Sequence, residues 1–155
     1  MYKYAKLLLW ILVLQSIGYL IGLMTSNSIN TWYLNLDRSL LTPPNYIFPI
    51  AWTTLYGLIA IAGWRLWELP SNNKVNVLKI LFVTQMILNW LWSPVFFYFQ
   101  QIDWALVILT GILLSTAVLI IKAYKIKKFI AYLLIPYLLW SLFAWYLNYY
   151  IYMYN

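Results

Sequence analysis

The side chains that perform most acid–base, nucleophilic and metal chemistry are nearly absent from this sequence. Among its 155 residues there is no His and no Cys, and the acids are Asp37, Glu68 and Asp103. Paired carboxylates, Ser-His-Asp sets and thiolate metal sites cannot be assembled, and the haem ligands left are Tyr and Met. We therefore expect no metal, no cofactor and, in the leading interpretation, no enzymatic activity.

Large aromatic rings and a few amides remain as candidate binding groups. Asn89 and Trp92 share a helix face by their spacing, and so do Trp52 and Tyr56. A third stripe repeats every four residues and consists of Pro136, Trp140, Ala144 and Asn148. Because an unpartnered amide is costly in apolar surroundings, Asn89 should face inward. It would serve there either as a contact between helices or as a contact to a ligand.

Three prolines, Pro49, Pro94 and Pro136, lie inside or near the ends of apolar segments, where each predicts a kink. Kinked helices pack imperfectly and can leave a cavity. A cavity lined by Trp, Tyr and Phe, with Ala144 making room, suits a flat, apolar, aromatic ligand. The alternative is an interfacial belt, which we expect for the aromatics near segment ends: Trp10, Trp64, Trp67 and those in residues 149–154.

The elements that position these residues follow from composition and charge. The chain is 65% hydrophobic and only 8% charged, a balance that favours lipid as its solvent. The charges bracket five uncharged stretches long enough to cross a bilayer. The sequence predicts an all-α integral membrane protein, a five-transmembrane-helix bundle forming one domain over residues 1–155. The expected spans are residues 5–24, 43–67, 75–99, 104–124 and 129–152.

Two features near the first span leave alternatives open. The polar segment 25–42 carries Trp32 and Tyr33, which are either interfacial anchors or part of a lid over a pocket. Gly18 and Gly22 have the spacing that lets helices approach closely. We favour packing of this pair inside the bundle over a seam between two copies.

The basic residues give the bundle a direction. If the chain crosses the membrane five times, nine of the ten fall on one side: Lys3, Lys6, Arg65, Lys74, Lys79, Lys122, Lys125, Lys127 and Lys128. Only Arg38 falls on the other. The positive-inside rule then places the N-terminus in the cytoplasm and the C-terminus outside, in a multi-pass protein of the bacterial cell membrane. Lysines at span ends face anionic headgroups, so the net charge of +7 does not predict nucleic-acid binding.

Six stretches together resemble the tryptophan-rich sensory protein family (TspO/MBR), whose mitochondrial members are called translocator protein or peripheral-type benzodiazepine receptor. The resemblance covers most of the chain, from about Gly18 to Tyr150. The stretches occur in family order: residues 31–33 (TWY), 41–44 (LTPP), 51–56 (AWTTLY), 88–97 (LNWLWSPVFF), 104–106 (WAL) and 136–144 (PYLLWSLFA).

The resemblance implies a five-helix fold, often a homodimer, with a pocket opening toward the loop between the first two helices. Family members bind protoporphyrin IX and related tetrapyrroles, sterols in some lineages, and synthetic aromatic ligands. It also implies a set of ligand-binding positions: Trp32 and Tyr33 on the lid, and Trp52, Tyr56, Asn89, Trp92, Trp104, Trp140, Ala144 and Leu147 in the pocket.

Two positions depart from the family pattern. Many relatives carry an acid four residues after the Trp of the WAL stretch, where this chain has Ile108, so no charged role is expected there. The sterol-associated pattern needs a basic residue after a Tyr late in the fifth helix. No basic residue follows Lys128, and specific cholesterol recognition is not expected.

Three functional hypotheses follow. The leading one is a membrane receptor or carrier that binds porphyrins and other flat hydrophobic ligands, with a role in tetrapyrrole transport or stress signalling. The second is light- and oxygen-dependent porphyrin degradation, with Trp52 and Trp140 as redox partners. The third is a regulatory membrane partner that binds no small ligand.

Overall fold

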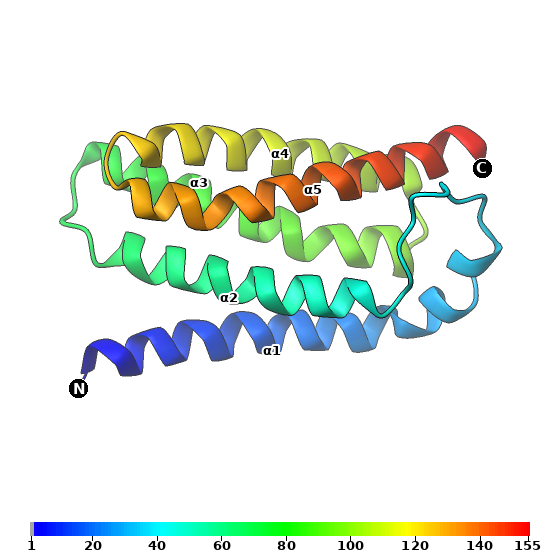
Figure 1. The fold of residues 1–155 in the computed structure, drawn as a ribbon, viewed down its shortest axis with the longest axis horizontal. Helices are drawn as coiled ribbons and strands as arrows, with labels where there is room; N and C mark the ends of the chain where they lie inside the picture. The colour runs from blue at the N-terminus through cyan, green and yellow to red at the C-terminus, as the bar shows by residue number, and fades with distance from the viewer. Residues whose placement is uncertain (1) are drawn as a thin grey trace.

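The computed structural model describes residues 2–155 except the side chain of Lys3, whose expected place among the basic residues lies outside the described part. Five long helices account for most of the chain (Figure 1): α1 (Tyr2–Asn30), α2 (Ile47–Trp67), α3 (Asn73–Ser93), α4 (Ile102–Tyr124) and α5 (Lys128–Tyr154). A 3₁₀ turn, η1 (Tyr33–Asn35), follows α1, and a π-helix, η2 (Pro94–Tyr98), continues α3. All five long segments are apolar enough to span a membrane, which confirms the predicted fold class.

The helices run up and down, so α1 and α5 end at the same end of the bundle (Figure 1). Contacts between neighbours give the order α1, α2, α5, α4, α3 around the bundle, and α1 closes the ring by touching α3, η1 and η2. One end, here called the loop end, carries residues 31–46 and the connection from η2 to α4. The opposite end, here called the basic end, carries Arg65 near the end of α2, Lys74 at the start of α3, and the connection from α4 to α5, which contains Lys125 and Lys127.

The first helix extends beyond its expected membrane span. Residues 25–30, which we expected to belong to the loop, are helical. Their hydroxyls explain the extension, because Thr25 Oγ1 donates to the carbonyl of Ile21 at 2.9 Å and Ser26 Oγ to that of Leu23 at 2.8 Å. A Ser or Thr residue whose hydroxyl bonds to a carbonyl of the preceding turn can remain within a helix. The loop between α1 and α2 is therefore residues 31–46.

The second helix begins at Ile47, after the predicted start of the second span at residue 43. Residues that precede proline are disfavoured in the helical region, and here two prolines follow one another. The chain instead makes two turns, in which Thr42 N donates to Ser39 O and Ile47 N to Pro44 O, both at 2.9 Å. Pro49 consequently lies in the first turn of α2, where its missing N–H costs no helix bond.

The glycine pair of α1 divides between two environments. A methyl group on Gly18 would overlap the ring of Tyr56 in α2, whereas one on Gly22 would meet no atom within 4 Å. Gly18 thus permits close packing inside the bundle, the alternative we favoured for the pair. Gly22 faces open surface.

Candidate functional site

A hydrogen-bonded group of three residues lies in the middle of the bundle. The hydroxyl of Tyr56 donates to Oδ1 of Asn89 at 2.7 Å, and Nδ2 of Asn89 donates to the hydroxyl of Tyr137 at 3.1 Å. The three come from α2, α3 and α5, each within about one turn of the centre of its candidate membrane span, Ile47–Trp67, Asn73–Tyr98 or Lys128–Tyr154. All are buried. The inward orientation expected for Asn89 is thus present, with both ends of the amide bonded.

Aromatic rings connect this polar group to the loop end. The ring centroid of Trp52 lies 5.8 Å from that of Tyr56 and 6.2 Å from that of Trp92. Trp92 stacks on Phe96 at 5.9 Å and 25°. We call the following set the aromatic series: Tyr137, Tyr56, Trp52, Trp92, Phe96, Tyr33 and Trp32. Such pairs each contribute about 0.5–1.5 kcal/mol beyond burial, so the series is a stabilising element as well as a candidate site.

The loop between α1 and α2 supplies the outer end of the series. Phe96 contacts Trp32 at 5.6 Å and Tyr33 at 6.1 Å between ring centroids, and Tyr33 also contacts Phe97 at 5.4 Å. Tyr33 is only 5% exposed. The two residues expected on a lid therefore cover the end of the series. The π-helix η2, which begins at Pro94, presents Phe96 and Phe97 to them.

Three further hydrogen bonds attach this loop to α5 and to Asn155, which directly follows it. Ser39 Oγ and the Tyr146 hydroxyl lie 2.9 Å apart. The side chain of Asn155 accepts from Asp37 N at 2.9 Å and donates to Asp37 O at 3.1 Å. Burial raises the pKa of the Tyr33 phenol above its ordinary value, and the nearby Arg38 guanidinium partly offsets that rise. The loop is thus a closed cover with a neutral phenol on its inner side at physiological pH.

Trp140 belongs to a separate ring contact on the same side of the bundle. Its ring lies 6.0 Å from Phe48 at the start of α2 and 5.7 Å from Phe143. Phe48 and Trp52 are one turn apart on α2, so Trp140 borders the aromatic series through that stripe. The indole Nε1 of Trp140 is buried without a hydrogen-bond partner among the described residues. It is a donor available to an acceptor that enters here.

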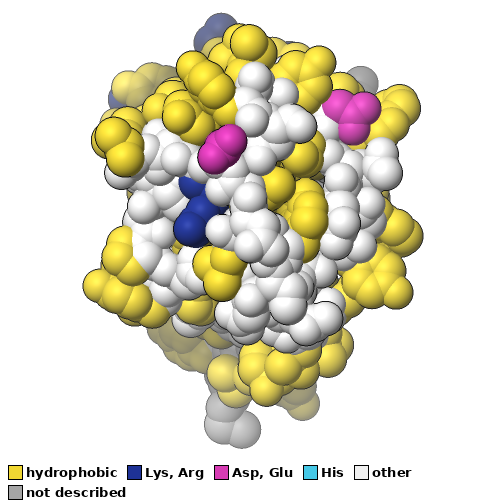
Figure 2. Space-filling view, turned by 90° about the vertical axis from the view of Figure 1, so that its right-hand side faces the viewer, with side chains coloured by type: hydrophobic (Ala, Val, Ile, Leu, Met, Phe, Trp, Pro, Cys, Tyr) yellow, Lys and Arg dark blue, Asp and Glu magenta, His cyan; other side chains and the backbone are white. Residues whose placement is uncertain are grey.

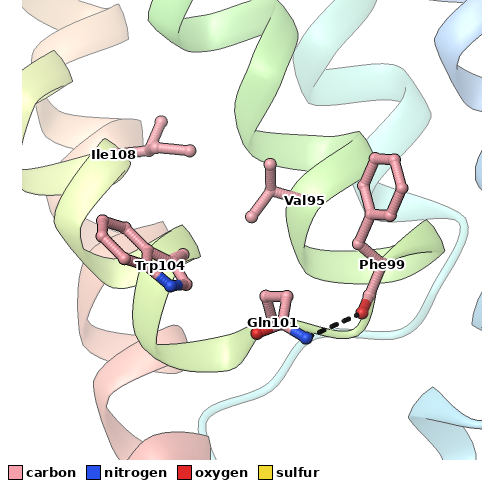
Figure 3. Close-up of a pocket in the computed structure, with 5 residues that line it drawn as sticks. All are labelled: Val95, Phe99, Gln101, Trp104 and Ile108. Carbon is pink, nitrogen blue, oxygen red and sulfur yellow. Dashed lines mark hydrogen bonds between the residues drawn. The ribbon is translucent and has the colours of Figure 1, made fainter.

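Trp104 lies elsewhere. It is 61% exposed and lines an outer groove of about 380 Å³ between η2 and α4, together with Val95, Phe99, Gln101 and Ile108 (Figure 3). In Figure 3, Ile108 extends from α4 toward Val95, and Trp104 lies one turn nearer the start of the same helix. The structure therefore does not bring Trp104 to the aromatic series, although the family resemblance groups it with the pocket. Ile108 contributes an apolar side chain to this groove.

The remaining expected positions are buried on α5. Ala144 and Leu147 are 7% and 5% exposed. Next to them Asn148 accepts from Trp92 Nε1 at 3.2 Å and donates to the carbonyl of Ile102 at 3.0 Å. Asn148 thereby fixes the Trp92 ring in place. Ala144 lies one turn before Asn148 on α5 and has a small side chain. The indole rings of Trp92 and Trp140 are therefore the bulky groups on this face.

Several residues of the site were missing from the expected set: Phe48, Phe96, Tyr137 and Asn148. Phe96 lay within a recognised motif and Asn148 within a recognised stripe, so spacing alone could have indicated both. Tyr137 lay within the recognised stretch 136–144, but nothing beyond a phenol near the centre of an apolar span singled it out there. Its importance depends on the hydrogen bond to Asn89, which becomes apparent only when the helices are packed.

The chemistry available here is binding by aromatic surfaces with a few hydrogen bonds. Within residues 2–155, no three acidic, His or Cys residues gather where they could hold a metal ion. The site instead offers tilted indole faces, phenols, an amide and the indole N–H of Trp140. Such a surface recognises flat apolar molecules that carry a small number of polar atoms.

Comparisons with known proteins agree with this description. A family model described as the TspO/MBR family matches residues 10–153. The chain is 39% identical over 150 residues to the tryptophan-rich protein TspO of Archaeoglobus fulgidus, covering 97% of both chains. It is 31% identical to the tryptophan-rich sensory protein of Cereibacter sphaeroides, over 76% of this chain and 73% of the relative. It is 34% identical to the human translocator protein, over 76% and 71%.

Proposed function

This chain belongs to the TspO/MBR family, and from that premise we propose that it binds porphyrin-like tetrapyrroles in the aromatic series. Family membership supports an integral, multi-pass membrane protein with a ligand-binding, transport or sensory role. The proposal adds the ligand class and the site. In this proposal the protein acts as a receptor or carrier and catalyses no reaction.

The observation that carries the proposal is the continuity of rings from the loop to the middle of the bundle. A tetrapyrrole is a flat conjugated molecule with polar nitrogens at its centre. The Trp52 and Trp92 rings, tilted by 35° to one another, can stack on its faces, and the polar group around Asn89 can meet its nitrogens. Each ring already contacts its neighbours, so a ligand must separate Trp52 from Trp92 in order to enter.

The position of the loop supports a direction of entry. The aromatic series reaches the bundle surface beneath Trp32 and Tyr33, at the end opposite the basic connections. By the positive-inside rule the basic end lies in the cytoplasm. The ligand then enters from the outer side of the membrane after the loop has moved away. A homodimer is compatible with this route, because the open surface beside Gly22 lies on α1.

The experiment that tests the proposal is a titration of the detergent-solubilised protein with protoporphyrin IX, followed by quenching of tryptophan fluorescence. The double variant Trp52→Phe and Trp140→Phe should bind more weakly. Trp145→Phe is the matched control, because it also removes an indole from α5 but at a ring stacked on Tyr149, away from the aromatic series. Equal affinity of the double variant and the wild type would contradict the site.

The same titration under illumination separates binding from degradation. Binding alone leaves no product beyond that of a protein-free sample bleached by light. Product that exceeds this control and falls in the Trp52 and Trp140 variants would replace the receptor proposal with the catalytic one. The absence of any quenching would instead favour a regulatory protein without a small ligand.

A further inference from the structure

A groove at the loop end is lined by residues of the loop between α1 and α2, the same loop that carries Trp32 and Tyr33. It encloses about 520 Å³ and its polar lining includes Asp37, Arg38, Thr42 and Asn45. Figure 2 looks onto this end and shows dark-blue Lys or Arg atoms next to a magenta acidic side chain, among white atoms of backbone and other side chains. Arg38 is the basic residue of the loop. The other described basic side chains lie toward the basic end of the bundle.

The charge of Arg38 is not used in an ion pair. Within the described residues the one ion pair joins Lys6 to Glu68, at the basic end. The Arg38 guanidinium instead lies over the ring of Tyr33, 5.1 Å from its centroid. A guanidinium carries five N–H donors in a planar fork, so donors remain for an acceptor that enters the groove. A carboxylate is the acceptor whose two oxygens match that fork.

Tyr33 places this cation next to the aromatic series. The Tyr33 ring contacts Arg38 and also Phe97, whose centroid is 5.4 Å away. A ligand whose apolar body lies among the rings therefore has a cation within a short side arm of its outer edge. The groove is also held in place, because Asp37 is bonded to Asn155 and Ser39 to Tyr146. Little ordering of the loop is needed for a charged group to bind.

We propose that this groove binds the carboxylate of an amphipathic ligand, with Arg38 as the cation and the hydroxyl of Thr42 and the amide of Asn45 as neighbouring donors. The inference rests on the proposed function and specifies its ligand class, an acidic amphiphile with a flat apolar body. Asp37, which lines the same groove, opposes the bound carboxylate. The site therefore selects for acids through Arg38 and limits their affinity through Asp37.

The test compares protoporphyrin IX, which has two carboxylates, with its dimethyl ester, which has none. The wild type should bind the diacid more tightly than the ester. Arg38→Gln should lower the affinity for the diacid by about tenfold, the size expected for a charge-assisted bond. The affinity for the ester should not change. Arg38→Lys should retain part of the preference, since it keeps the charge but loses the fork. Asp37→Asn should raise the affinity for the diacid and leave the affinity for the ester unchanged.

Each outcome decides a separate point. Equal loss of diacid and ester in Arg38→Gln would show that Arg38 only supports the loop and would overturn the carboxylate site. Unchanged diacid affinity in that variant would overturn it as well, while porphyrin binding itself would stand. If the wild type binds neither compound, the proposed function fails and the carboxylate site fails with it. Circular dichroism of each variant verifies that the helices remain folded.

Discussion

The hydroxyl of Tyr56 donates to Oδ1 of Asn89, 2.7 Å away and at the centre of the membrane-spanning bundle. Because Tyr137 accepts from the other end of the same amide, Asn89 has a partner on both sides. A ligand that bonds to Asn89 must therefore displace a phenol. A ligand that binds at this depth replaces one set of hydrogen bonds by another, so the amide adds little to affinity. It instead disfavours ligands that cannot form a hydrogen bond there.

The first prediction compares two amides one turn apart on α3. Asn89→Leu should lower stability by about 1–3 kcal/mol, because two buried phenols lose their partner. Gln85→Leu should not lower it, since neither polar atom of the fully buried Gln85 amide has a partner among the described residues. Thermal unfolding in detergent measures both. A Gln85 variant as unstable as the Asn89 variant would contradict this account of α3.

The second prediction concerns Trp104. Trp104→Phe should leave porphyrin affinity unchanged, because this side chain lines the outer groove of Figure 3. Trp92→Phe should weaken binding, because it removes an indole of the aromatic series and its bond to Asn148. The pair is measured by fluorescence quenching with the same porphyrin. Reduced affinity in Trp104→Phe would return that residue to the ligand site.

The position of Trp104 also shows what could not be predicted from the sequence. The number of spans was predictable because charge is excluded from hydrocarbon, and the uncharged stretches could be counted. Which face of α4 carries Trp104 depends on the rotation of that helix against α3 and α5. A tryptophan near a span end satisfies the pattern of an interfacial residue and of a pocket residue equally well.

Asn89 shows the opposite case. Its inward direction followed from the cost of an amide in lipid, without knowledge of any neighbour. Its partners did not follow, because Tyr56 and Tyr137 are 33 and 48 residues away in the chain. The end of α1 was missed for another reason. Ser and Thr normally suggest a loop, but here their hydroxyls bond to the preceding turn. Ligand contacts at these positions remain a prediction.

The third prediction uses the glycines of α1. Gly18→Leu should destabilise the protein, because the new side chain overlaps the Tyr56 ring and must push α1 away from α2. Gly22→Leu should leave stability unchanged, as nothing lies within 4 Å of the added carbon. Thermal unfolding tests both variants. If Gly22→Leu alone reduces the size of the detergent-solubilised particle, α1 forms a seam between two copies.

The fourth prediction concerns the attachment of the loop to α5. Tyr146→Phe removes the bond to Ser39 and should speed both porphyrin association and hydrogen exchange in residues 31–46. Tyr150→Phe is the control on the same helix, because the Tyr150 ring packs on that of Tyr154. Stopped-flow quenching and exchange mass spectrometry give the two rates. Unchanged rates in the Tyr146 variant would mean that other contacts hold the loop closed.

The length of α1 has a consequence for the membrane around the protein. Its 29 residues extend about 43 Å, against a hydrocarbon thickness of about 30 Å. Its apolar, uncharged part, residues 7–24, accounts for about 27 Å of this length, so the polar residues 25–30 carry the helix beyond the hydrocarbon and into the headgroup layer. The contacts of α1 with η1 and η2 then lie near the membrane surface.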